Sequence, residues 1–141
     1  MIAYFDTSAI VPLVVDEATT ETCNRLWTES TRVVSVRLIY PEARAALARA
    51  GRMGRLTRSQ LNAAVLELDS LIEEVEVIEL SPDIARSAGE LAQQHGLRGY
   101  DAVHLAAALA VADDDLVLVT GDVELAAAAQ AAGIAVSVVE A

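Results

Sequence analysis

Short apolar runs alternate along the chain with longer segments in which apolar residues recur at helical spacing. The first run covers residues 2–5, contains β-branched and aromatic members, and stops abruptly at Asp6. Such a run is typical of a strand buried on both faces. Similar runs predict four further strands, at residues 32–36, 75–78, 116–119 and 134–139.

The segments between these runs predict helices. Two short helices are expected at residues 8–15 and 18–29. Pro41 is well placed at a first helical position, and the long helix it begins should end at Gly51. Thr57 is expected to cap the next helix, so that residues 42–74 form a helical hairpin. Later helices are predicted from Ser81–Pro82 to His95–Gly96, at 102–112 and at 123–132.

Strands that alternate with helices indicate a parallel sheet with right-handed crossover connections. With 141 residues, of which 54% are hydrophobic, the chain is long enough for one continuous core. We therefore predict an α/β fold, a three-layer α/β/α sandwich with a five-stranded parallel sheet, in a single domain covering residues 1–141.

The composition indicates a protein that works in a reducing compartment. Cys23 is the only cysteine, which excludes an internal disulfide. The N-terminal apolar run ends at Asp6 without a preceding basic region, unlike a signal peptide. The longest apolar stretch, residues 105–112, is far below the ~18 residues of a membrane-spanning helix. A soluble, cytoplasmic protein without membrane contact is expected.

The charge distribution is uneven. The net charge of -11 argues against general nucleic-acid binding, which depends on neutralising phosphates. All ten basic residues are arginine, and no acid lies between Glu42 and Glu67. That interval holds five arginines: Arg44, Arg49, Arg52, Arg55 and Arg58. They form either a local basic strip on an acidic body or an ordinary solvated helix face.

Four acids stand where predicted strands end or predicted helices begin: Asp6, Glu42, Asp101 and Asp122. In open α/β sheets, ligands bind beyond the carboxyl ends of the strands. Carboxylates that meet there repel each other and raise one another's pKa, and a bound hard cation removes that penalty. Oxygen ligands favour Mg²⁺ or Mn²⁺. We interpret the four acids as ligands of a shared metal that would activate water for attack on a phosphodiester.

Each of these residues also has an ordinary structural explanation. The three aspartates are suited to capping a helix, and an acid such as Glu42 is common in a first helical turn. The hydroxyls of Ser8 and Thr120 lie beside proposed acids, and they serve either as hydrogen-bond donors to metal ligands or as plain caps. His104 is expected to contact Asp101 or solvent. Tyr100 and Trp27 are expected to be packing residues.

Other catalytic chemistries lack support in the chain. His95 and His104 are nine residues apart and have no partnering cysteines, which argues against zinc. The chain contains neither a nucleophile-elbow motif nor a glycine-rich phosphate loop.

Four motifs together resemble those of a PIN domain and follow its order. They are Phe5-Asp6-Thr7-Ser8-Ala9, Tyr40-Pro41-Glu42, Tyr100-Asp101-Ala102-Val103-His104-Leu105-Ala106 and Thr120-Gly121-Asp122-Val123-Glu124-Leu125. The similarity covers essentially the whole length. More narrowly, the chain resembles the VapC-type toxins of bacterial toxin–antitoxin pairs.

The resemblance implies a Mg²⁺- or Mn²⁺-dependent endoribonuclease that a cognate VapB-type antitoxin holds silent. It also favours a homodimer, as does the alanine-rich, apolar composition. Ser8 and Thr120 match the family's polar positions beside the first and last acids. We expect Arg44, Arg49 and Arg52 to contact RNA or the antitoxin. The implied metal-binding and catalytic acids are Asp6, Glu42, Asp101 and Asp122.

Three alternatives remain beside this interpretation. A response-regulator receiver domain also has an acidic Mg²⁺ pocket, but it requires a lysine, and the chain has none. A haloacid-dehalogenase-type phosphatase would have an aspartate where Ser8 stands. A catalytically silent interaction module with this fold would be favoured if any of the four acids were alanine or asparagine, and none is.

Overall fold

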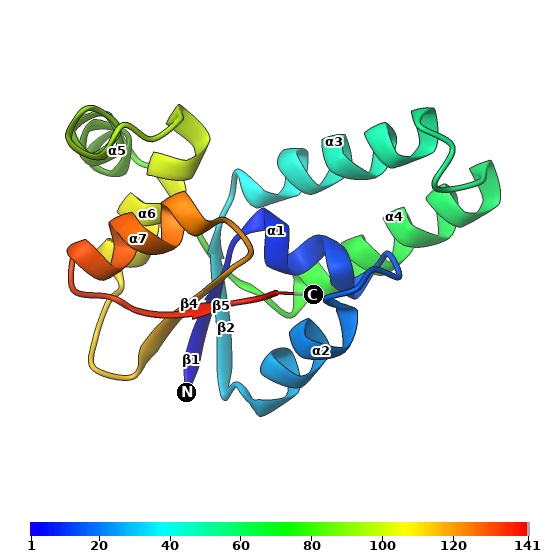
Figure 1. Cartoon of the computed structure of the whole chain (residues 1–141), viewed down its shortest axis with the longest axis horizontal. Coiled ribbons are helices and arrows are strands. Elements are labelled where there is room, and N and C mark those ends of the chain that lie inside the picture. The colour runs from blue at the N-terminus through cyan, green and yellow to red at the C-terminus, as the bar shows by residue number, and fades with distance from the viewer. Residues whose placement is uncertain (141) are drawn as a thin grey trace.

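A sheet of five parallel strands lies at the centre of the protein, in the order β3-β2-β1-β4-β5. The computed structural model describes residues 1–140 (Figure 1). The strands are β1 Ile2–Phe5, β2 Arg32–Val36, β3 Glu76–Ile78, β4 Leu116–Thr120 and β5 Ala135–Val138. The helices are α1 Thr7–Ile10, the 3₁₀ helix η1 Val11–Leu13, α2 Thr20–Glu29, α3 Ile39–Arg52, α4 Arg58–Glu73, α5 Pro82–His95, α6 Gly99–Ala110 and α7 Val123–Ala131.

Strand β1 occupies the middle of the sheet and pairs with a strand on each side. Ile2 lies opposite Arg32 of β2 and opposite Leu116 of β4. The β1 residues Ala3, Tyr4 and Phe5 are fully buried, as expected for a strand covered on both faces. The chain that leaves β1 therefore emerges at the centre of the sheet's carboxyl edge.

Helices cover both faces of this sheet, which confirms the predicted three-layer α/β/α fold. Helices α5, α6 and α7 lie on one side and α1 to α4 on the other (Figure 1). Leu105 and Leu118 belong to the first core, and Leu47 and Leu68 to the second. No helix among residues 1–140 is long and apolar enough to cross a membrane.

Several predicted helix ends are confirmed together with their local chemistry. Thr57 and Gln60 form a reciprocal capping box at the start of α4, because each side chain accepts a hydrogen bond from the other residue's backbone N–H. Ser81 caps α5 by accepting from the Ile84 N–H at 3.2 Å. Gly96 ends α5 with a φ of 65°, a left-handed conformation that glycine adopts without strain.

Several predicted helix boundaries differ from the structure, among them the following three. The segment predicted as one helix at 8–15 is split into α1 and η1, because Pro12 has no N–H with which to continue the α-helical pattern. Helix α3 begins two residues before Pro41, at Ile39. Helix α6 begins at Gly99, so Asp101 lies inside its first turn rather than before it.

Candidate metal centre and active site

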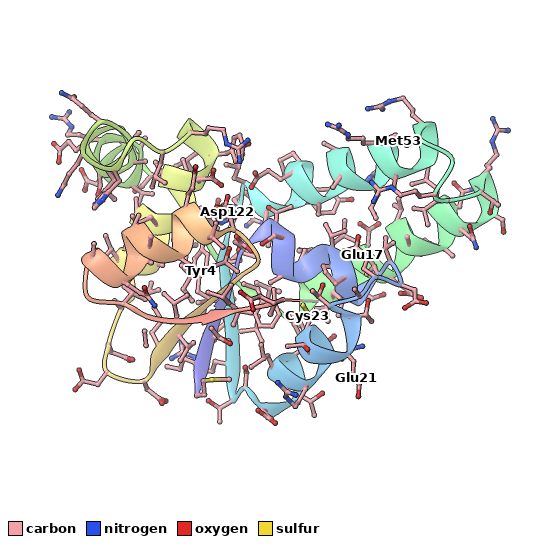
Figure 2. All side chains as sticks on the ribbon, in the orientation of Figure 1. Tyr4, Glu17, Glu21, Cys23, Met53 and Asp122 are labelled. Atoms are coloured by element: carbon pink, nitrogen blue, oxygen red, sulfur yellow. The ribbon has the colours of Figure 1, made fainter. Side chains whose placement is uncertain are left out.

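One open pocket brings the four predicted acids together at the carboxyl edge of the sheet. Asp6 follows β1, Glu42 lies in the first turn of α3, Asp101 in the first turn of α6, and Asp122 directly before α7. All four line this pocket, whose volume of about 610 Å³ is that of a typical small-ligand site. Figure 2 shows Asp122 between the two helical layers, close to the start of α1.

Asp6 is the most deeply buried of the four acids, with 3% of its surface exposed. Its Oδ1 accepts hydrogen bonds from the Ala9 N–H at 3.1 Å and from the Ser8 hydroxyl at 2.6 Å. Its Oδ2 accepts from the Thr120 hydroxyl at 2.5 Å. Burial raises the pKa of Asp6, and the nearby His104, together with these hydrogen bonds, offsets part of that rise.

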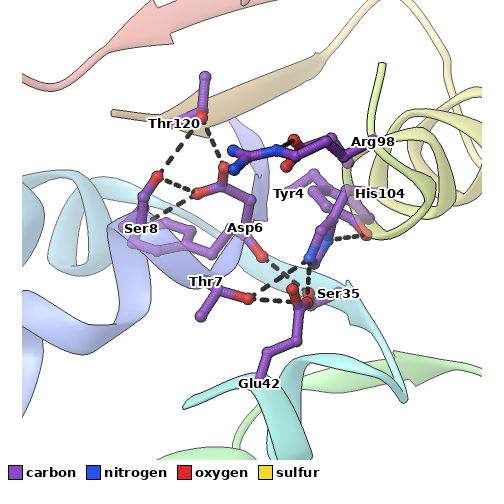
Figure 3. A network of polar contacts seen from close by, with 12 residues as sticks. Tyr4, Asp6, Thr7, Ser8, Ser35, Glu42, Arg98, His104 and Thr120 are labelled. Carbon is purple, nitrogen blue, oxygen red and sulfur yellow. Dashed lines mark hydrogen bonds and ion pairs between the residues drawn. The ribbon is translucent and has the colours of Figure 1, made fainter. Parts of the chain in front are cut away.

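Ser8 and Thr120 also connect the loop after β4 to the loop after β1. The Gly121 N–H donates to the Ser8 hydroxyl at 2.7 Å, and the Asp122 N–H donates to the Thr120 hydroxyl at 3.0 Å. The two hydroxyls thus lie against Asp6 and hold the backbone that leads to Asp122. This is the position that the sequence predicted for hydrogen-bond partners of the acids (Figure 3).

Glu42 is held by a buried network that the sequence did not predict (Figure 3). His104 is 2% exposed, and its Nε2 lies 2.6 Å from Glu42 Oε1. The Thr7 hydroxyl donates to the same oxygen at 2.9 Å, and the Tyr4 hydroxyl lies 2.9 Å from His104 Nδ1. The expectation that His104 contacts Asp101 or solvent is wrong. Its place in α6 points the ring toward β1 and α3 instead.

The chemistry of the Glu42 carboxylate indicates which ring nitrogen of His104 carries the proton. An ionised Glu42 only accepts hydrogen bonds, so Nε2–H of His104 is the donor to it. In the neutral ring, Nδ1 is then an acceptor, and the Tyr4 hydroxyl donates to it. The chain of bonds from Tyr4 through His104 fixes the position of the Glu42 carboxylate from the interior of the protein.

Asp101 and Asp122 share one cationic partner. Asp122 caps α7 by accepting from the Glu124 N–H at 2.9 Å and the Leu125 N–H at 3.2 Å. Arg98 places its Nε 3.3 Å from Asp101 Oδ2 and its Nη2 3.8 Å from Asp122 Oδ2. Burial and the nearby Asp122 charge raise the pKa of Asp101, and Arg98 opposes that rise.

The sequence did not predict Arg98 as a site residue, because the clustered arginines of residues 44–58 are the more prominent basic feature. The spacing of Arg98, three residues before Asp101, was an available signal, since residues i and i+3 are neighbours on a helix. The three arginines predicted to contact RNA or antitoxin lie elsewhere. Arg44 lines a groove between α3 and α4, and Arg49 and Arg52 are exposed farther along α3. Figure 2 shows Met53 at the far end of that hairpin.

The donor atoms in the pocket fit a hard divalent cation. The four acids offer only oxygen, and both ring nitrogens of His104 already have partners. Among residues 1–140, however, no three acid, histidine or cysteine side chains stand close enough together to hold a metal. Two of the four acids point to Arg98, and both oxygens of Asp6 accept hydrogen bonds. The shared metal site stays a prediction.

Comparison with known proteins identifies the family of the chain. The family model of the PIN domain matches residues 3–131. The chain belongs to the PIN domain family. Ribonuclease VapC45 of Mycobacterium tuberculosis (strain CDC 1551 / Oshkosh) is 43% identical over 132 residues, which make up 94% of this chain and 92% of the relative. The resemblance to VapC-type PIN domain proteins is confirmed.

Solved structures extend this comparison to the fold. PAE2754 from Pyrobaculum aerophilum superposes with a TM-score of 0.72 at 26% identity, and the match covers 96% of this chain and 83% of the other. VapBC2 from Rickettsia felis, bound to a DNA fragment from its promoter, gives a TM-score of 0.66. That match covers 99% of this chain and 100% of the other at 16% identity, so it supports the fold alone.

Proposed function

We propose that this PIN domain protein is a Mg²⁺- or Mn²⁺-dependent endoribonuclease and the toxin of a VapBC-type pair. The observation that carries the proposal is the single pocket lined by Asp6, Glu42, Asp101 and Asp122. It is supported by the 43% identity to a protein named as a ribonuclease. The reaction is hydrolysis of an RNA phosphodiester, in which water adds across the bond to the 3′ oxygen and leaves a 5′-phosphate and a 3′-hydroxyl.

Asp6, Asp101 and Asp122 would hold the metal, with Glu42 as a further acid of the same pocket. A divalent ion held by these acids would polarise the phosphodiester and favour deprotonation of the attacking water. Five carboxylates, those of the four acids and of Glu17, line the pocket with one arginine and leave it strongly negative, so a divalent cation is attracted to it. Mg²⁺ and Mn²⁺ are equally compatible with oxygen donors.

The neighbouring polar residues position these acids. Ser8 and Thr120 restrict the Asp6 carboxylate through hydrogen bonds to its two oxygens. His104 and Thr7 do the same for Glu42 through Oε1. Such outer hydrogen bonds orient metal ligands, and because these groups donate to the carboxylates, they favour the ionised form that binds a cation.

The proposal is tested by incubating the purified protein with single-stranded RNA, with Mg²⁺ or Mn²⁺ and with EDTA. We expect metal-dependent cleavage with 5′-phosphate and 3′-hydroxyl ends, and loss of cleavage in Asp6→Asn with its fold intact. Asp114→Asn is the matched control, because Asp114 is exposed at the opposite edge of the sheet. Products with 2′,3′-cyclic phosphates would contradict the mechanism. A folded protein without metal-dependent cleavage would favour the silent interaction module.

The proposed partners are a VapB-type antitoxin and a second copy of the chain. The 43% identity to a VapC ribonuclease supports the first, because the resemblance to VapC-type toxins implies a VapB-type antitoxin. Co-expression with the product of the adjacent gene should give a stable complex without ribonuclease activity. For the homodimer, sedimentation at micromolar concentration without antitoxin should give twice the mass of 14.9 kDa, and a monomer would contradict it.

We further propose that Arg44, Arg49 and Arg52 bind the RNA backbone or acidic groups of the antitoxin. Arginine suits both, because its planar fork pairs with phosphate and with carboxylate. In an Asp6→Asn background that does not cleave, Arg49→Ala/Arg52→Ala should weaken RNA binding and reduce the salt slope by about 1.4, at ~0.7 per phosphate contact. Arg86→Ala is the control. An unchanged slope would identify an ordinary solvated helix face.

A further inference from the structure

Arg98 is the one arginine, within the described chain, that lines the pocket of the four acids. It bridges two carboxylates that come from different elements, Asp101 of α6 and Asp122 before α7, at 3.3 and 3.8 Å. Its guanidinium carbon lies 4.9 Å from the centre of the Tyr100 ring. Figure 3 shows the Arg98 side chain reaching over the Asp6 carboxylate from the α6 side.

The side chains of Arg98, Asp101 and Asp122 differ in exposure, and this difference decides which of them can give way to a metal ion. The Arg98 side chain is 66% exposed, whereas the Asp101 and Asp122 side chains are 11% and 23% exposed. Asp122 is tied by its cap on α7, whereas the side-chain hydrogen bond that Asp101 accepts comes from Arg98 itself. The Arg98 side chain is the most exposed of the three, so it is the partner that can move away from this contact into solvent.

Helix stability does not explain an arginine at this position. Arg98 is the N-cap of α6, and it makes no side-chain capping bond there. The N-terminus of a helix carries partial positive charge, so a cationic residue at that end is unfavourable and an acid such as Asp101 is favourable. The arginine is therefore better explained by the acids that it contacts than by the helix that it begins.

We propose that Arg98 is a built-in counter-cation that competes with the divalent metal for Asp101 and Asp122. This inference rests on the proposed function, because it takes the four acids as the metal site. Two cations that share the same carboxylate oxygens repel each other strongly at these distances. Metal binding and the contacts of Arg98 with these two acids exclude each other, and the protein holds its acids in one arrangement without metal and another with it.

The proposal accounts for the incomplete geometry of the metal site. The acids already line one pocket, yet no three of them, among the described residues, are arranged to hold an ion. Arg98 draws Asp101 and Asp122 to itself and lowers the repulsion between them. Its departure frees both acids to turn to a metal, so the affinity for metal is lower than the acids alone would give.

The test is calorimetric titration of Mn²⁺ into the full chain without RNA, at about 0.15 M salt, where distant charges are screened beyond ~8 Å. The variants are Arg98→Gln, Arg98→Lys, Arg86→Gln and Asp6→Asn. Arg86→Gln makes the same change in net charge at an exposed position of α5 outside the pocket. We expect Arg98→Gln to bind Mn²⁺ about threefold to tenfold more tightly than wild type, since exposed ion pairs are individually weak but two are lost. The Mn²⁺ affinity of Arg98→Lys should fall between those of wild type and Arg98→Gln, because lysine keeps the charge without the planar fork.

The variants separate the two hypotheses. If Asp6→Asn binds Mn²⁺ as tightly as wild type, the proposed metal site is wrong. If Asp6→Asn loses binding while Arg98→Gln matches Arg86→Gln, the metal site stands and the role of Arg98 as competitor is refuted. Circular dichroism of each variant without metal checks that the fold is kept. Weaker binding in Arg98→Gln would also overturn the proposal.

Discussion

The buried chain Tyr4–His104–Glu42 predicts a measurable energetic coupling between residues that lie 100 positions apart in sequence. The test is a double-mutant cycle with Tyr4→Phe, His104→Leu and the double variant. Phenylalanine removes only the hydroxyl, and leucine replaces the imidazole with an apolar group of similar size. Each single change leaves the other member of the pair buried without its partner.

The expected magnitudes follow from the burial and the contacts. His104 is 2% exposed and Tyr4 is fully buried. Tyr4→Phe leaves His104 Nδ1 unsatisfied, which costs about 1–2 kcal/mol. His104→Leu leaves the Tyr4 hydroxyl without its His104 partner and removes the bond to the Glu42 carboxylate, for about 3–5 kcal/mol in all. In the double variant, neither member of the Tyr4–His104 pair is left without its partner. Its loss of unfolding free energy should therefore be smaller than the sum of the two single losses by about 1–2 kcal/mol.

Urea unfolding at pH 7, followed by far-UV circular dichroism, measures these values. With a slope of roughly 1–3 kcal/mol per molar urea, the coupling corresponds to a midpoint difference on the order of 1 M, well above error. Thr57→Ala/Tyr4→Phe, which pairs Tyr4→Phe with a change at the distant start of α4, is a matched control and should be additive. Additivity within about 0.5 kcal/mol in the Tyr4–His104 cycle would refute the buried bond.

Two further predictions concern pH and helix capping. Because burial raises the pKa of Asp6, the stability that comes with its protonation is present at low pH and is lost as pH rises through the raised pKa. Metal-free Asp6→Asn should therefore have a higher urea midpoint than wild type at pH 7, with a difference that shrinks on acidification; an equal or lower midpoint at pH 7 would contradict this. Thr57→Ala removes the side-chain acceptor of the capping box and should cost about 1 kcal/mol in the same assay without affecting RNA cleavage. If Thr57→Ala lost RNA cleavage, the far end of the α3–α4 hairpin would have a role in the activity, which would contradict this prediction.

The local parts of the fold were predictable because they depend on short-range chemistry. The capping box at Thr57, the left-handed Gly96 and the strand that ends at Asp6 each follow from a few adjacent residues. The gathering of the four acids was also predictable, since parallel strands present their carboxyl ends at one edge of the sheet. Boundaries failed where two local preferences compete, as at Pro12, which is favourable early in a helix but interrupts one that has already begun.

The partners of the acids were not predictable, because they depend on side-chain directions across long separations. His104 looked like a neighbour of Asp101 on one helix, yet its ring packs edge-on against Tyr4 of the central strand, with ring centres 5.8 Å apart. His104 lies three residues after Asp101 in α6, and the packing of that helix decides whether its ring faces solvent or the sheet. Arg98 was hard to predict for a different reason. The distribution of charge singles out the clustered arginines of residues 44–58 and not a single arginine beside an acid.

Capping and metal binding do not exclude each other for these aspartates, because a capping carboxylate keeps one oxygen for another partner. Asp122 uses Oδ1 to cap α7 and turns Oδ2 toward Arg98 in the pocket. Asp6 likewise caps α1 through Oδ1, while Oδ2 accepts from Thr120. A carboxylate fixed through one oxygen loses little further conformational entropy when the other oxygen binds a cation. Capping is thus compatible with preparing these acids for a ligand, and aspartate, with two oxygens on a short stem, is suited to both tasks at once.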